Sequence, residues 1–384
     1  MKQQCYTQCN VIKKENMYIF KKNEIGMSGL YIVFNKGSLY ENKGQRGTHH
    51  LMEHLLCRIV QNKMQTTFDI NGIELNGYTS FEQVCIYIAG IETRLNPHKD
   101  DFISTLLNGL ENLTEDAFNN EKKTVLEEYS DWFTDQTNRT REYVNRKYYN
   151  DAGPIGILDE IENFSFTDAI EEYKTYFTKP SYIIEIGKTS HQFSYVSYSQ
   201  NEPIINNKFG IYNDIIEDKT TTCENKINTI VLIKDLISEE DSLPFYFGVD
   251  MLNSGLHSPL YKAIRDDNGL SYCSTSNIDL LSVNLRSYFM ASTNIKNTMK
   301  LTDVYRNILL NVDKYLTIDR YNIVMNMWEL DEEESNILKY KRSFDLIRTG
   351  LININDGFNT LKYDTVVDIM KKYIYEDNLL FIKH

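Results

Sequence analysis

Runs of β-branched and aromatic residues separated by polar turns indicate strands in the first half of the chain. Residues 17–20 and 30–34 are such runs, and each is bounded by Asn, Lys or Gly. A second pair of runs, at residues 73–80 and 84–88, has the same character, and residues 180–187 predict a closing strand. The pattern therefore predicts a sheet whose strands are interrupted by helical segments.

Apolar residues that recur at helical spacing predict the helices of this half. The clearest helix follows Thr114, which we expect to be its N-cap, and two acidic residues in its first turn suit the helix dipole. Its apolar positions are Phe118, Val125, Tyr129 and Trp132. Further helices are predicted at residues 102–113 and 164–177.

The second half shows a similar order of strands and helices. Strands are predicted at residues 229–233, 280–292 and 378–383, and helices at residues 243–253 and over much of 299–351. A short helix should begin at Pro259 and end near Gly269, with a strand starting at Leu270. The charged run at residues 328–335 reads as a solvated helix face.

These elements predict an α+β fold with two similar domains, each a mainly antiparallel sheet with helices packed on one face. A chain of 384 residues is too long for one ordinary core. A polar segment at residues 188–226, rich in Ser, Asn and Asp, is the expected boundary. We therefore predict an N-terminal domain at residues 1–200 and a C-terminal domain at residues 201–384.

Composition narrows the classes of function. The chain is 41% hydrophobic and 25% charged, which is typical of a soluble globular protein. Its net charge of -13 argues against a nucleic-acid partner and is compatible with substrates that carry Lys or Arg. The 6 cysteines are scattered, and neither a signal peptide nor an apolar stretch of membrane-spanning length is found. We expect a cytoplasmic protein with reduced thiols and no membrane contact.

The most informative motif is His50-x-x-Glu53-His54. On a helix, residues three and four apart share a face, so the two histidines can bind one metal ion while Glu53 stands beside it. This is the inverzincin pattern of zinc hydrolases. Three of the 7 histidines fall at positions 49, 50 and 54, and leucines nearby give the segment an apolar side. The alternative is a chance cluster on an amphipathic helix.

A zinc site with two histidines needs a third protein ligand, and a carboxylate from another helix is a common choice. Glu121 and Glu128 lie seven residues, or two helical turns, apart on the helix that follows Thr114. The residues alone leave the choice open, because Glu121, Glu127 and Glu128 are also compatible with a solvated helix face.

The motif with the Glu121-x6-Glu128 pair some seventy residues later resembles the pitrilysin and mitochondrial processing peptidase family of zinc proteases. The resemblance implies one zinc ion per chain, with Glu128 as the third ligand and Glu121 as a supporting carboxylate. His49 stands where members of the family usually carry a small residue. That departure leaves the ligands intact but is expected to add a polar group near the metal.

Two further segments gain a role only through this resemblance. Asn76, Gly77, Tyr78 and Thr79 resemble the substrate-binding strand of the family, in which an exposed edge strand accepts an extended peptide as an added strand. An ordinary turn that leads into a buried strand is the alternative. Arg265 and Tyr272 match the type and spacing of the pair that holds the substrate carbonyl, and without the resemblance they are a surface charge and one of 27 tyrosines.

The implied activity is zinc-dependent endopeptidase action on short or unfolded peptides, with removal of a leader from a precursor peptide as one role. Zinc lowers the pKa of a water molecule toward about 7 and Glu53 takes its proton and returns it to the leaving amine. Arg265 and Tyr272 would stabilise the oxyanion. The alternative is a non-catalytic scaffold or a partner-dependent subunit that binds peptide.

The resemblance also implies assembly. In the family, two two-domain chains or two fused halves close around a chamber, and the Arg/Tyr pair acts on the zinc site of the facing half. This chain has the length of one half and carries both elements, so we predict a homodimer, or a heterodimer with a related subunit, whose sites are completed between chains.

Overall fold

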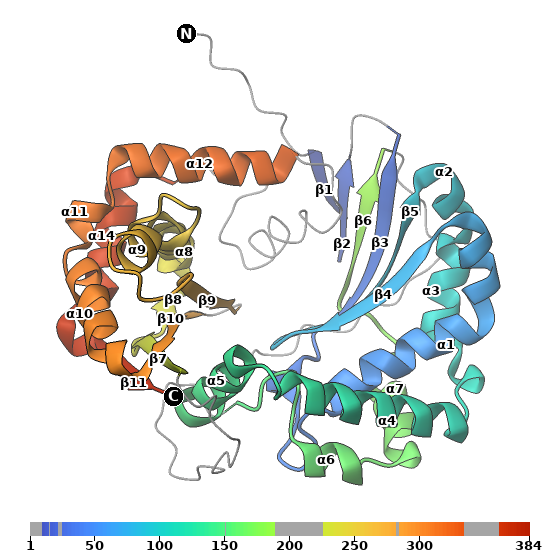
Figure 1. Cartoon of the computed structure of the whole chain (residues 1–384). Coiled ribbons are helices and arrows are strands. Elements are labelled where there is room, and N and C mark those ends of the chain that lie inside the picture. The colour runs from blue at the N-terminus through green and yellow to red at the C-terminus, as the bar shows by residue number, and fades with distance from the viewer. Residues whose placement is uncertain are drawn as a thin grey trace. The chain divides into compact units, whose positions relative to one another are not determined.

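The protein is described from a computed structural model (Figure 1), which covers residues 10–14, 16–21, 25–149, 151–188, 226–281, 284–333 and 361–384. The chain divides into two compact units, Met1–Ile205 and Asn206–His384. The predicted domain boundary at residue 200 lies outside the described residues. No helix in the described part of the chain is long and apolar enough to span a membrane.

A six-stranded sheet forms the centre of the first unit, with strand order β1-β2-β6-β3-β5-β4. Its pairs are antiparallel apart from β2 and β6, which run parallel. Strands 17–20, 30–34, 73–80, 84–88 and 180–187 were predicted, and each has its counterpart here. The strands are β1 (Asn10–Lys14), β2 (Met17–Lys21), β3 (Met27–Phe34), β4 (Glu74–Thr79), β5 (Val84–Ile91) and β6 (Tyr182–Gly187).

Most helices of the first unit pack on one face of this sheet (Figure 1). The side chains that alternate onto that face, such as Leu30 and Ile32 of β3, share one hydrophobic core with Leu55 and Ile59 of the first helix. The helices are α1 (Thr48–Asn71), α2 (Glu92–Leu95), α3 (Lys99–Asn108), α4 (Glu115–Trp132), α5 (Gln136–Val144), α6 (Leu158–Asn163) and α7 (Phe166–Tyr176).

The second unit has an antiparallel sheet of its own, with order β11-β7-β10-β8 and with β9 paired to β10. Its strands are β7 (Lys226–Ile233), β8 (Ile237–Ser238), β9 (Thr275–Leu280), β10 (Asn284–Asn294) and β11 (Leu379–Lys383). Its helices are α8 (Glu239–Asn253), α9 (Pro259–Tyr261), α10 (Thr298–Leu309), α11 (Val312–Tyr315), α12 (Ile318–Glu333) and α14 (Tyr363–Tyr373). They share a second hydrophobic core with the sheet, and the predicted α+β class is confirmed.

Some boundaries differ from those predicted. The strand expected from Leu270 begins only at Thr275. The reason is that the N–H of Leu270 donates to the carbonyl of Ile264 at 2.9 Å, which ties this residue to the end of the preceding helical turn. That turn is a π-helical segment, Lys262–Asp266, which follows the three residues of α9. The expected stop at Gly269 is confirmed by its φ of 58°.

The first residue of the charged run, Trp328, does not lie on the solvated face predicted for it, and the exposure of the side chains that follow it is outside the described residues. Trp328 itself is 2% exposed, and its indole N–H donates to Asp250 at 2.8 Å. The part of this run after Glu333, and the helix predicted to continue toward residue 351, lie outside the described residues.

Candidate metal centre

The first turn of α1 is fixed by a carboxylate from the preceding loop. Gly47 is the N-cap residue and has no side chain to cap the helix. Glu41 takes that role, because its two oxygens accept hydrogen bonds from the backbone N–H groups of Gly47 (2.8 Å) and His49 (2.7 Å). Burial raises the pKa of Glu41 to about 7, although the nearby His49 and these two hydrogen bonds lower it. The helix that carries the histidines therefore starts at a defined residue.

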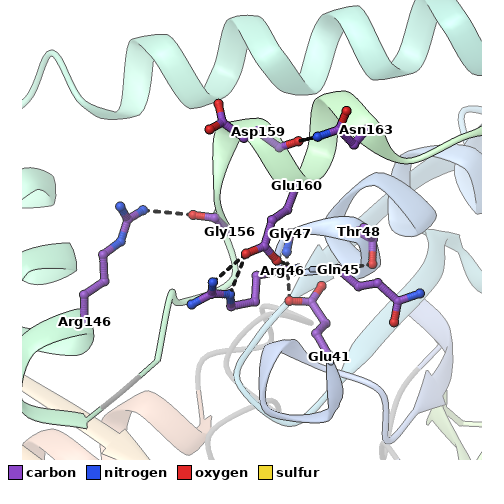
Figure 2. Close-up of polar contacts among 10 residues, drawn as sticks. All are labelled: Glu41, Gln45, Arg46, Gly47, Thr48, Arg146, Gly156, Asp159, Glu160 and Asn163. Atoms are coloured by element: carbon purple, nitrogen blue, oxygen red, sulfur yellow. Dashed lines mark hydrogen bonds and ion pairs between the residues drawn. The ribbon is translucent and has the colours of Figure 1, made fainter. Parts of the chain in front are cut away.

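A contact between two glycines holds the same turn against the segment before α6. Gly47 and Gly156 both have positive φ, 93° and 75°. A Cβ atom on Gly47 would lie 2.9 Å from Cα of Gly156, and one on Gly156 would lie 2.2 Å from Cα of Gly47. Beside this contact Arg46 donates its backbone N–H and its Nε to the carboxylate of Glu160, at 2.7 and 3.0 Å (Figure 2). Contacts between two chain segments more than a hundred residues apart thus hold the start of α1 in place.

The structure brings the three predicted metal ligands together. His50 and His54 lie one turn apart on α1, with ring centroids separated by 5.0 Å. Glu128 comes from α4, which packs against α1. Its Oε2 lies 3.6 Å from Nε2 of His50 and 3.5 Å from Nε2 of His54. Within the described part of the chain, this is the one group of three or more His, Cys, Asp or Glu side chains whose ligand atoms all lie within 4.8 Å of one another.

The chemistry of this group fits a zinc ion. Two imidazoles and one carboxylate are a common set for a catalytic zinc site, in which the fourth position is left for water or substrate. Burial and the neighbouring His54 lower the pKa of His50 to about 4, so its ring is neutral, as a metal ligand must be. No hydrogen-bond partner among the described residues reaches the buried Nδ1 of His50. The side chain of Glu128 is 47% exposed, which leaves the site open on that side.

Glu53 lies beside the three ligands without being one of them. Its Oε2 accepts a hydrogen bond from the Thr79 hydroxyl at 3.0 Å. Burial raises the pKa of Glu53, although His54 and the Thr79 hydrogen bond lower it, and the charge of Glu128 raises it further. A carboxylate with a raised pKa next to a metal site is suited to accept a proton from water and to return it.

Glu121 supports the second histidine. Its Oε2 lies 3.5 Å from Nδ1 of His54, the ring nitrogen opposite to the one that faces Glu128. The contact with His54 lowers the pKa of Glu121, burial opposes that shift, and a hydrogen bond from Arg58 reinforces it. For His54, burial lowers the pKa, but the contact with Glu121 and the charges of Glu53 and Glu128 outweigh burial and raise the pKa above its usual value.

Sequence reasoning missed Arg58, although its spacing of four residues from His54 is the signal that could have found it. The third glutamate, Glu127, faces solvent instead: its side chain is 68% exposed and pairs with Lys123 at 3.8 Å. The structure therefore distinguishes Glu121, Glu127 and Glu128, which the sequence alone could not tell apart, by the groups that each one contacts.

Asn76, Gly77, Tyr78 and Thr79 all lie in β4, which stands at the edge of the described sheet and pairs with β5 on one side. These four residues form the strand itself and are exposed or half-buried, so the alternative of an ordinary turn does not hold for them, and their role in substrate binding stays a prediction. The Asn76 side chain accepts a hydrogen bond from the N–H of Gly77 at 2.8 Å. Gly77 faces Glu53 so closely that a Cβ atom there would lie 2.7 Å from Glu53 Oε1.

His49 leaves the metal ligands intact, as predicted, but its ring contacts other groups and does not add the polar group expected near the metal. Its ring is buried, with Nδ1 3.3 Å from the carbonyl oxygen of Gly37 and Nε2 3.6 Å from Glu172. It also packs edge-on against Phe177. The reason is the helix itself: one residue along α1 turns a side chain by about 100°, away from the face of His50 and His54.

Arg265 and Tyr272 lie in the second unit. The Arg265 guanidinium stacks on the Tyr272 ring at 4.4 Å from its centroid and on Tyr261 at 5.1 Å. Tyr272 is 76% exposed. The structure thus brings the two residues together with each other, and their predicted action on a zinc site stays a prediction.

Comparison with known proteins points to one family. Residues 18–155 match the family described as insulinase (Peptidase family M16). The zinc protease PqqE of Helicobacter pylori is 27% identical over 185 residues, which are 44% of this chain and 40% of that protein. The beta subunit of the human mitochondrial-processing peptidase is 24% identical over 172 residues, 42% of this chain and 34% of its own length. The matches thus span less than half of these relatives.

Solved structures match nearly the whole chain. A protease from Helicobacter pylori superposes with a TM-score of 0.77 at 17% identity, over 97% of this chain and 98% of that chain. A peptidase M16 inactive domain from Pseudomonas fluorescens superposes with a TM-score of 0.75 at 12% identity, over the same shares of the two chains. At these identities the likeness shows the fold alone.

Proposed function

We propose that this chain, which carries an insulinase-like Peptidase M16 domain over residues 18–155, is a zinc-dependent endopeptidase. The observation that carries the proposal is the convergence of His50, His54 and Glu128 on one point, with Glu53 beside them and outside the ligand group. A relative named zinc protease supports the choice of metal.

In this mechanism His50, His54 and Glu128 would hold the ion. When bound, zinc supplies a Lewis acid that polarises a peptide carbonyl and makes a nearby water more acidic. Glu53, whose raised pKa suits the task, accepts a proton from the attacking water at its carboxylate and passes it to the leaving amine. Thr79 holds the carboxylate of Glu53 in place during both transfers.

The edge position of β4 supports a peptide as substrate. An extended peptide can pair with the outer edge of β4 through its backbone, and this places a scissile bond next to Glu53 because β4 itself contacts Glu53. Recognition of this kind reads the backbone, so short or unfolded peptides are the expected substrates. Removal of a leader from a precursor peptide is one such reaction.

The proposal extends to assembly. Arg265 and Tyr272 would bind the carbonyl oxygen or the oxyanion of a peptide held at the zinc site of a second chain, in a homodimer or in a heterodimer with a related subunit. The relative that is named a beta subunit supports a two-chain arrangement. Mixing Arg265→Ala with Glu53→Gln chains tests the homodimer, since exchange of subunits should restore one intact site in each dimer that contains one chain of each variant.

A peptide-binding subunit that needs a partner chain for activity is the second candidate, and the relative named a subunit of the mitochondrial-processing peptidase supports it. The two are separated by incubating the purified chain with a mixture of unstructured peptides and reading the products by mass spectrometry. Cleavage by the wild type, but not by Glu53→Gln or by chelator-treated protein, supports the peptidase. A chain that binds one zinc ion yet cleaves nothing supports the partner-dependent subunit, and a chain that binds no zinc refutes the enzyme.

A further inference from the structure

Arg58 lies one turn after His54 on α1 and reaches the carboxylate that supports that histidine. Its Nε donates to Oε1 of Glu121 at 2.6 Å, and its Nη2 contacts the same oxygen. The other oxygen, Oε2, lies 3.5 Å from Nδ1 of His54. The two oxygens of one carboxylate are therefore divided between Arg58 and His54.

The register of the two helices explains this division. From His50 to Arg58, α1 rises about 12 Å, and from Glu128 back to Glu121, α4 falls about 10.5 Å, at 1.5 Å per residue. Two antiparallel helices thus match His50 with Glu128 at one end and Arg58 with Glu121 at the other. Val125, halfway along α4, is fully buried in the core that these helices share. His54 lies between the two carboxylates and contacts both.

We propose that Arg58 is a positioning residue for the metal centre, which sets the orientation of His54 through Glu121. A glutamate carboxylate can rotate, and a planar guanidinium that grips one oxygen with two nitrogens restricts that rotation. The second oxygen is then aimed at Nδ1 of His54, and Nε2 is presented to the metal. Carboxylates that hold a ligating histidine in this way strengthen metal binding. The inference rests on the proposed zinc site.

A purely structural role for Arg58 is the competing explanation, because the same contact ties α1 to α4. The exposures favour positioning: the Arg58 side chain is 40% exposed, whereas that of Glu121 is 9% exposed. Removing a side chain that reaches the surface leaves the core of α1 and α4 packed. The change should therefore affect the affinity for zinc more than the stability of the zinc-free chain.

The test measures the zinc affinity of the full chain by competition with a chromogenic chelator. In Arg58→Met we expect affinity about 10- to 100-fold weaker than wild type, the range that such supporting contacts contribute. Arg58→Lys keeps the charge but cannot contact one oxygen with two nitrogens, so its zinc affinity should lie between those of Arg58→Met and the wild type. The matched control is Arg306→Met, since Arg306 also pairs with a glutamate, Glu376, at 3.1 Å on the surface of the second unit. Its zinc affinity should equal that of the wild type.

A double-mutant cycle shows whether Arg58 acts through Glu121. If it does, Arg58→Met added to Glu121→Gln weakens zinc binding no further, and the absorption bands of bound cobalt(II) change in the same way in both single variants. Additive losses, or an Arg58→Met chain whose affinity stays within twofold of wild type, would overturn the inference while leaving the proposed function intact. A wild-type chain that binds no zinc would overturn both.

Discussion

Replacing Gly47 by alanine tests how firmly the start of α1 is fixed. The φ of 93° at Gly47 is unfavourable for a residue with a Cβ atom and costs about 1–2 kcal/mol. The added Cβ would also lie 2.7 Å from Cδ1 of Ile161 and 2.9 Å from Cα of Gly156, where ordinary contact begins at 3.4 Å. Overpacking of this kind costs about 1–3 kcal/mol. We therefore expect the free energy of unfolding of the first unit to fall by about 2–5 kcal/mol.

Gly44 provides the control, because it shares the positive φ of Gly47 without the contact. Its φ is 95°, and a Cβ atom there would meet nothing within 4 Å. Gly44→Ala should therefore lose only the conformational part, about 1–2 kcal/mol. The difference between the two variants, about 1–3 kcal/mol, measures the contact with Gly156 and Ile161.

Urea unfolding followed by tryptophan fluorescence measures both losses. The chain has 2 tryptophans, and Trp328→Phe leaves Trp132 as a reporter of the first unit alone. Zinc affinity should fall in Gly47→Ala and not in Gly44→Ala, because His50 lies within the first turn of the helix that would shift. Equal destabilisation by the two variants would refute the reasoning, since it would mean that the contact contributes nothing.

Three further predictions concern single side chains of the first unit. Thr79→Val should lower kcat about tenfold at nearly unchanged KM, because the hydrogen bond to the Glu53 carboxylate is lost. In the same peptide assay, Thr79→Ser should have a kcat close to that of the wild type. The pKa of His50 falls from 6.5 to about 4 on folding, so the unfolded chain binds more protons between these two pH values. The zinc-free protein should therefore lose stability as the pH drops through this range. In urea titrations at several pH values, His50→Gln should make this dependence of stability on pH weaker. Lys99→Met removes the cation that lies 2.7 Å from the fully buried Glu185 carboxylate and should cost about 3–5 kcal/mol by thermal unfolding. Most of this loss should be recovered in Lys99→Met with Glu185→Leu.

The sequence predicted the elements of the fold better than their arrangement. The N-cap role of Thr114 is local, and it is confirmed by a hydrogen bond from the N–H of Ala117 at 3.2 Å. The insertion of β6 between β2 and β3, and its parallel pairing with β2, depend on contacts across more than 150 residues, for which periodicity carries no signal. The strand start at Leu270 was predicted wrongly for a similar reason. An apolar residue at this position suggests the start of a strand, and the sequence does not show that its N–H donates to the carbonyl of Ile264 at the end of the preceding helical turn.

In the metal centre too, the sequence predicted local features but not the contacts between elements. The positions of His50 and His54 follow from helical periodicity alone, because four residues make about one turn. Glu121 and Glu128 are equivalent by that argument, since seven residues return a side chain to nearly the same face. What distinguishes them is which turn of α1 each one meets, and that is set by the register between two helices. The register depends in turn on core residues such as Val125 and on the anchored start of α1. Family resemblance supplied the distinction because relatives with the same spacing are expected to share the same register.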